Sequence, residues 1–178
     1  AELMLNSDSE MTLVGGNFGV YHVGRKTQTP KGTITLNGAI TNVPAIYFAG
    51  TVNVNTNVTV AKIGGVDTVQ NATNLTYQTV APGFTNGCGN LNLGTFTVPD
   101  GATYEWTLAD TNAPAGTGYD QITGTTVTFG GAWTVSLDVA DFTGTLDGSE
   151  VFTIIDGTSI TDIGTPTVTA PGTGYRVG

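Results

Sequence analysis

The sequence predicts an all-β fold, and three observations support this prediction. Thr, Val and Ile dominate the 178-residue chain, in which Thr alone occurs 34 times, and their branched Cβ atoms favour strands. Apolar and polar residues alternate with a period of two over many short segments, as in half-buried strands. Clusters of Gly, Asn, Pro and Asp separate these segments and supply turns. A short right-handed parallel β-helix (a β-solenoid) is the favoured architecture, with a β-sandwich or jelly roll as the alternative.

The alternation predicts short strands along the whole chain. They are Leu3–Leu5, Met11–Val14, Phe18–Val23, Gly32–Leu36, Ala45–Phe48, Thr51–Val54, Asn57–Ile63, Val66–Val69, Leu75–Val80, Leu91–Val98, Thr103–Leu108, Asp120–Ile122, Thr125–Phe129, Trp133–Val139, Glu150–Ile155 and Thr165–Thr169. The clearest predicted turns are Asn37-Gly38, Gly64-Gly65, Asp100-Gly101, Gly130-Gly131, Asp147-Gly148 and Asp156-Gly157, since such pairs supply positive φ angles. No single repeat period is visible. We expect one all-β domain over residues 15–178 and a strand segment over residues 1–14 that copies can exchange.

Composition and charge exclude several classes of protein. The net charge is −9 with only five basic residues, too few to neutralise the phosphates of a nucleic acid. No apolar run approaches the length of about 18 residues that a membrane span needs. The chain begins at Ala1, which suits a mature chain left by signal cleavage. With one Cys, few Lys and abundant Thr, Asn and Gly, these features favour an extracellular or cell-surface protein.

Residues for catalysis are scarce, and we expect no enzymatic activity. His22 is the sole histidine and no Gly-x-Ser-x-Gly motif occurs, so a serine triad is not supported. Cys88 lies in an Asn-Gly-Cys-Gly-Asn segment that predicts an exposed turn carrying a reduced thiol. The acids Glu105 and Asp110 lie near Trp106, but nothing else supports a glycosidase there.

A structural calcium site is the one metal centre that the sequence suggests, and no other cofactor is expected. Residues 116–122 read Gly-Thr-Gly-Tyr-Asp-Gln-Ile, which fits the core of a calcium-binding β-roll repeat in a single copy. Calcium takes about six to eight oxygen ligands. The candidate ligands are Asp120, Asp138, Asp141 and Asp147.

Residues 101–157 resemble a known group of exported proteins. The elements GATYEWTL, GYDQITG, a Gly-Gly strand and EVFTIIDG occur there in order. They are similar to the C-terminal part of bacterial autotransporter-type β-strand-repeat passengers and of secreted proteins with a PEP-CTERM sorting tail. A fainter likeness covers residues 12–38. The resemblance implies an exported, all-β, β-helical surface protein and assigns no catalytic residue.

Self-assembly is the function that these observations favour. We expect a non-enzymatic structural protein that forms an extracellular filament, sheet or coat by strand or rung pairing between copies, head to tail. The expected interface residues are Leu3, Leu5, Met11 and Leu13 in the N-terminal segment and the basic residues Arg25, Lys26 and Lys31, which would face the acidic half of a neighbour. The alternative is an adhesin or carbohydrate-binding module that holds a surface glycan through Tyr104, Trp106, Tyr119 and nearby acids.

Overall fold

A computed structural model describes residues 10–17, 20–23, 32–83 and 87–170 of the chain. Its strands are β1 (Glu10–Asn17), β2 (Val20–Val23), β3 (Gly32–Val54), β4 (Val58–Gln70), β5 (Leu75–Pro82), β6 (Asn90–Val98), β7 (Ala102–Thr107), β8 (Gln121–Phe129), β9 (Ala132–Asp138), β10 (Ile155–Thr161) and β11 (Thr165–Thr169). The one helical element in these described ranges is a 3-10 turn, η1 (Ala72–Asn74). The all-β prediction is therefore confirmed.

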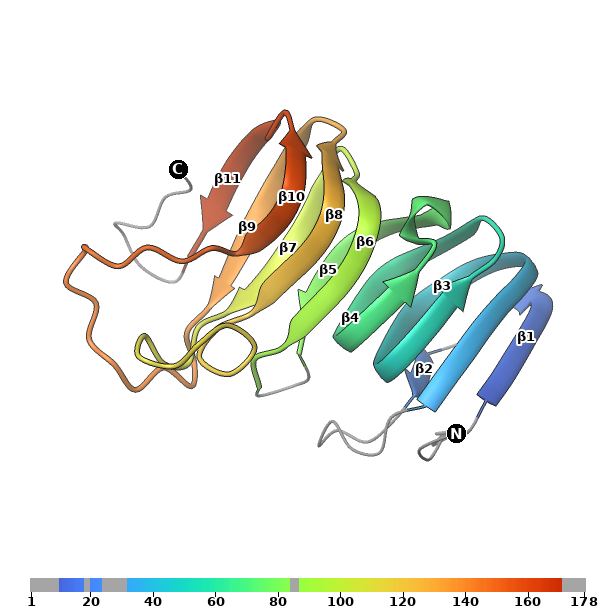
Figure 1. The fold of residues 1–178 in the computed structure, drawn as a ribbon, viewed down its shortest axis with the longest axis horizontal. Helices are drawn as coiled ribbons and strands as arrows, with labels where there is room; N and C mark the ends of the chain where they lie inside the picture. Colours follow the sequence, from blue (N-terminus) through green and yellow to red (C-terminus); the bar gives the residue numbers. More distant parts are fainter. Residues whose placement is uncertain (1–9, 18–19, 24–31, 84–86, 171–178) are drawn as a thin grey trace.

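All eleven strands join in one curled sheet, and every ladder between them is parallel. The strands lie side by side along the long axis, from β1 and β2 at one end to β10 and β11 at the other (Figure 1). A sandwich or jelly roll is built from antiparallel sheets. The parallel ladders therefore do not fit that alternative.

Successive passes of the chain stack in two columns of strands. From β5 onward each strand pairs with the strand two places further along, so that β5, β7, β9 and β11 form one column and β6, β8 and β10 form the other. We call them the β11 column and the β10 column. The long strands β3 and β4 bend and contribute to both. One row of paired residues in the β11 column reads Val20, Ala45, Lys62, Thr79, Thr103, Thr134 and Thr167, one residue from each of seven passes.

The core lies on the inward side of these columns, where side chains of successive passes stack in register. The row next to the one above contains Ile46, Ile63, Val80, Tyr104 and Val135, which are all buried. Strand β6 shows the same alternation of buried and exposed positions. Period-2 patterning thus places apolar side chains in the core and Thr and Asn on the outer surface.

Three of the predicted turns are wrong, because glycine bends a strand in this sheet without ending its pairing. Asn37-Gly38, Gly64-Gly65 and Asp156-Gly157 lie inside β3, β4 and β10. At Gly65 the backbone has φ 124°, and a Cβ there would lie 1.9 Å from the carbonyl oxygen of Phe48 in the pass beneath. Only glycine allows the two passes to approach so closely at this bend.

The predicted strands also need corrections. The segments 32–36, 45–48 and 51–54 are parts of the single strand β3 rather than three strands. The predicted strand Glu150–Ile155 is wrong: residues 150–154 form a loop and β10 begins at Ile155. Leu3–Leu5 lies outside the described residues. Of the segment 1–14, residues 10–14 belong to β1, which pairs with β3 of the same chain.

Candidate functional site: the open sheet ends and the Asp120 junction

Both ends of the sheet present a strand edge that has no partner within the described residues. At the N-terminal end, β1 and β2 each pair with β3 alone. At the C-terminal end, β10 pairs with β8 alone and β11 with β9 alone. Open edges of this kind present rows of unpaired N–H and C=O groups that can pair with another chain.

The outer edge of β10 has no partner strand within the described ranges. Ile154 accepts a hydrogen bond from the N–H of Ile122 in β8 at 3.0 Å. Residues of a parallel strand turn their backbone groups alternately to one neighbour and the other. The groups of Ile155 and Gly157 therefore face away from β8. Strand β10 contains no proline and no basic residue to obstruct pairing there.

The edge of β11, in contrast, is blunted by Pro166. The N–H of Thr165 donates to the carbonyl of Gly131 at 3.2 Å, which turns the next residue toward the open edge. That residue is Pro166, which has no N–H to donate. Proline on an edge strand is a common protection against pairing with another chain.

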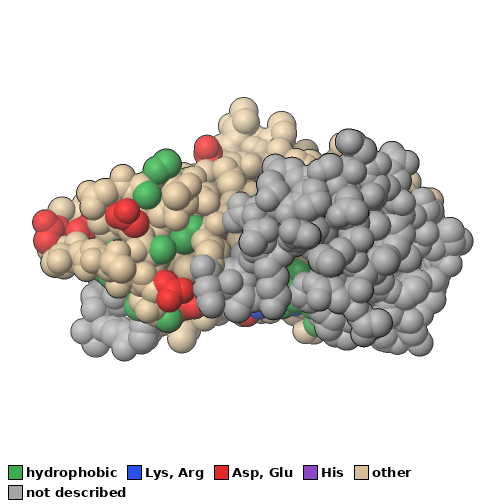
Figure 2. All heavy atoms as spheres, turned by 90° about the horizontal axis from the view of Figure 1, so that it is seen from below, with side chains coloured by type: hydrophobic (Ala, Val, Ile, Leu, Met, Phe, Trp, Pro, Cys, Tyr) green, Lys and Arg blue, Asp and Glu red, His purple; other side chains and the backbone are tan. Residues whose placement is uncertain are grey.

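Apolar side chains are left uncovered at the same end. Ile160 continues the inward row formed by Phe96 and Val127, yet 42% of it is exposed because no further pass covers it. Ile163, just beyond β10, is 52% exposed. Figure 2 shows hydrophobic and acidic side chains interspersed over the C-terminal half of one face.

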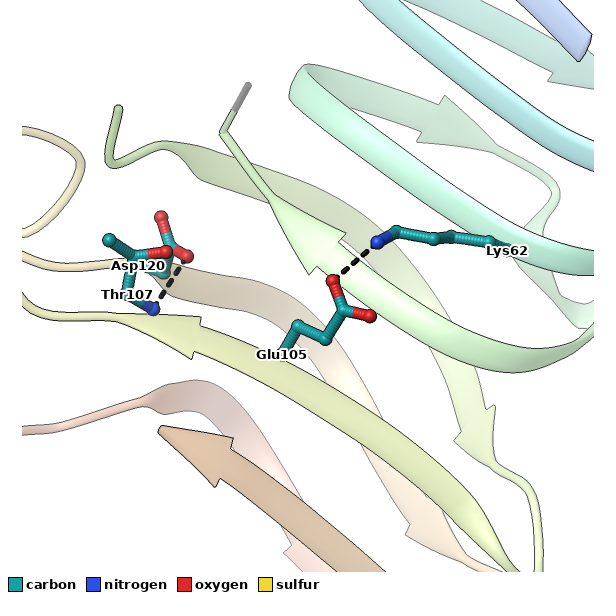
Figure 3. A network of polar contacts seen from close by, with 4 residues as sticks. All are labelled: Lys62, Glu105, Thr107 and Asp120. Atoms are coloured by element: carbon teal, nitrogen blue, oxygen red, sulfur yellow. Dashed lines mark hydrogen bonds and ion pairs between the residues drawn. The ribbon is translucent and has the colours of Figure 1, made fainter. Parts of the chain in front are cut away.

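The second feature is a buried carboxylate, Asp120, which joins three passes of the chain. Its Oδ1 accepts a hydrogen bond from the N–H of Gly89 at 2.7 Å, and its Oδ2 accepts one from the N–H of Thr107 at 2.9 Å (Figure 3). Its main-chain oxygen accepts the indole N–H of Trp106 at 2.7 Å. Only 1% of Asp120 is exposed. The side chain thus fixes Gly89 and the end of β7 against the start of β8.

Burial changes the proton affinity of both titratable groups at this junction. Desolvation raises the pKa of Asp120 to about 7, although the hydrogen bonds from Thr107 and Gly89 oppose the rise. Desolvation also raises the pKa of Cys88 to about 11, and the nearby charge of Asp120 adds to this. The Cys88 thiol donates to the carbonyl of Thr107 at 3.7 Å. The prediction that Cys88 is exposed is wrong, because only 5% of it is exposed and it lies against the end of β7.

The aromatic residues of the adhesin alternative are largely inaccessible. Tyr104 is 2% and Trp106 7% exposed, and both belong to the core. Tyr119 is half-buried and packs with Trp106 and Phe152, with ring centroids 6.2 Å and 5.1 Å from its own. The three rings therefore hold the 139–154 loop against the sheet and leave no aromatic face formed by Tyr104 and Trp106.

The candidate calcium ligands do not come together in one cluster of carboxylates. The described residues include no group of three or more His, Cys, Asp or Glu side chains placed to hold a metal ion. Asp120 is committed to the junction above, and Asp138 accepts the N–H of Ala140 at 2.9 Å. Asp147 accepts the N–H and the hydroxyl of Ser149 within its own loop. Asp141 lies exposed in the same loop.

The remaining candidate residues lie in different parts of the chain. Met11 and Leu13 are in β1, in register with the fully buried Ile34 and Leu36 of β3, and His22 is in β2. Glu105 forms an ion pair with Lys62, two passes away (Figure 3). The predicted interface residues outside the described part of the chain are Leu3, Leu5, Arg25, Lys26 and Lys31.

Sequence reasoning missed the contribution of Asp120 to the junction and the contrast between β10 and β11. The position of Pro166 inside a Thr-alternating strand was the one signal that could have indicated a protected edge.

Among the described residues, no helix has the length and apolar character needed to cross a membrane. No protein-family model matches the chain, and no curated protein or solved structure matches it.

Proposed function

We propose that the chain is a non-enzymatic structural protein that assembles head to tail into an extracellular filament, sheet or coat. The observation that carries the proposal is the pair of open ends: every ladder is parallel, and the outermost strands at both ends have a partner on one side only within the described residues. Because the strands all run in one direction, one end of a copy is complementary to the opposite end of the next. Such a contact is heterologous and repeats without closing.

We further propose that the stacked passes form a short right-handed parallel β-helix. Two columns of strands joined by bends and loops, with one residue of each pass in register, support this architecture. Parallel crossovers in a sheet are right-handed in nearly all proteins. The large uncovered apolar residues at the C-terminal end are what an uncapped β-helix would present.

Absence of catalysis belongs to the same proposal. At the junction each carboxylate oxygen of Asp120 accepts a backbone N–H, and a pKa of about 11 keeps Cys88 protonated at neutral pH. Export to the cell surface rests on the composition and on the resemblance of residues 101–157 to exported β-strand-repeat proteins.

Electron microscopy and sedimentation of the purified chain test this function, alongside a variant lacking residues 1–14. Filaments or large particles from the full chain, formed without any ligand, are the expected result. Their loss in the truncated variant would place the contact at the N-terminal end. A full chain that remains monomeric up to high concentration, with or without calcium, would refute self-assembly.

A further inference from the structure

We propose that the open edge of β10 in one copy pairs in parallel with the open edge of β1 in the next, as the hydrogen-bonded contact of the assembly. This inference rests on the proposed self-assembly and specifies its interface. The adjacent edge of β11 adds packing with few hydrogen bonds, because Pro166 interrupts it.

Continuity of the β10 column is the first argument. One row of this column runs through Thr51, Thr68, Asn92, Thr123 and Asp156. At the N-terminal end of this column, two parts of β3 lie side by side, and each residue of one part lies next to the residue 18 positions earlier. The side chains of Asn53 and Asn55 show this offset, because they donate hydrogen bonds to the side chains of Thr35 and Asn37. The same offset relates Thr51 to Thr33, which pairs with Glu10 of β1. Strands β1 and β10 are thus the two ends of one column.

The dimensions of the two ends agree. Strand β1 has 8 residues and β10 has 7. The backbone N–H groups of Ile155 and Gly157 face the open side of β10 and find acceptors when another parallel strand is added.

Burial of apolar surface is the second argument. A strand added to β10 covers Ile160, which at 42% exposure is the least buried member of a row whose other members, Phe96 and Val127, are at most 2% exposed. In the register of the column, residues 11 and 13 of β1 pair with Ile34 and Leu36 of β3, which are fully buried.

The register makes one unfavourable contact, which is itself informative. Extending the row beyond Asp156 places Glu10 of the next copy beside it, so that two carboxylates face each other across the contact. Like charges directly opposite each other destabilise paired strands, and salt screens them. Assembly is therefore expected to strengthen with added salt.

Disulfide trapping tests the inference. The double variant Glu10→Cys and Asp156→Cys puts two thiols on adjacent paired strands, within the Cα separation of about 4.4–6.8 Å that a disulfide spans. Mild oxidation should give a ladder of covalent oligomers. The control Glu10→Cys with Thr167→Cys keeps the N-terminal cysteine and moves the other to the β11 column, and it should give no ladder. Unmodified chain, in which Cys88 is buried, is oxidised in parallel.

A second variant examines the edge without engineered thiols. Ile155→Pro removes an N–H on the open side at the first residue of β10, a position at which a strand tolerates proline, and it should replace filaments by single particles with an unchanged circular dichroism spectrum. If unmodified chain forms no large species, self-assembly itself fails. If it forms filaments while the Glu10–Asp156 pair gives no ladder, or the Thr167 control gives an equal one, assembly stands and this interface is wrong.

Discussion

The buried Asp120 predicts a fold whose stability falls as the pH rises toward neutrality. The carboxyl has a pKa of about 7 in the folded chain against 3.8 for an ordinary Asp. The folded state therefore binds a proton more tightly than the unfolded state. The contribution of Asp120 to stability is most favourable below pH 4 and declines between pH 4 and pH 7, and the full penalty applies above pH 7.

The shift sets the size of this effect. About three pKa units at 1.36 kcal/mol each give an upper bound of about 4 kcal/mol between pH 4 and pH 8. The exposed carboxyls act in another range. Hydrogen bonds from Ser149 hold the pKa of Asp147 below its usual value, so this group stabilises the fold above pH 4 and loses that contribution only at lower pH.

Urea unfolding at pH values from 4.5 to 8.5 measures the effect. Asp120→Asn should flatten the profile, because the amide keeps one acceptor oxygen and never ionises. The variant should be less stable than the unmodified protein near pH 5, because Nδ2 cannot accept the second backbone N–H, and this deficit should shrink toward pH 8, where the Asp120 carboxyl is charged. Asp147→Asn removes the same charge from an exposed loop and should leave the slope unchanged. A stability that rises from pH 5 to pH 8, or an Asp120→Asn profile parallel to that of the unmodified protein, would refute the reasoning.

Three further predictions concern packing, the thiol and the ion pair. Gly65→Ala should lower the free energy of unfolding, measured in urea, by more than about 4 kcal/mol, since the new Cβ would overlap a backbone carbonyl. Gly101→Ala, which has open space around it and φ 74°, should lower it by about 1–2 kcal/mol. Comparable losses would contradict the close approach of passes at Gly65. Cys88 should resist iodoacetamide in the native protein and react after denaturation, as its burial requires. Rapid labelling of the native protein would contradict the burial of this thiol. Lys62→Met should change stability by less than about 1 kcal/mol, because the side chains of Lys62 and Glu105 are 26% and 45% exposed; a larger loss would mean that the pair holds passes together.

The sequence predicted the strand class well because strand formation depends on local properties. Branched residues and period-2 alternation identify Leu75–Val80, Leu91–Val98 and Thr165–Thr169 almost as the structure has them. The period of the stack could not be read, because it is not constant. Lys62 pairs with Thr79, 17 residues on, and Thr79 with Thr103, 24 on, while Thr134 pairs with Thr167, 33 on. Loops of growing length between the passes erase any repeat in the sequence.

The candidate site was harder to predict because it depends on contacts between distant residues. Asp120 bonds to Gly89, 31 positions away, and the motif around it suggested calcium rather than a backbone junction. The three wrong turns at Asn37-Gly38, Gly64-Gly65 and Asp156-Gly157 have a related cause. A bend that continues a parallel ladder and a turn that reverses the chain both need glycine, and only the pairing of the next pass distinguishes them.

The helical rise of the assembly, measured by electron cryomicroscopy, tests the central claim most directly. If copies stack end to end and continue the β10 column, each contributes the seven passes represented from Val20 to Thr167. With about 4.8 Å between paired strands, the rise per subunit is then about 34 Å, with strands perpendicular to the filament axis. Filaments with a clearly different rise, or with strands along the axis, would contradict end-to-end stacking.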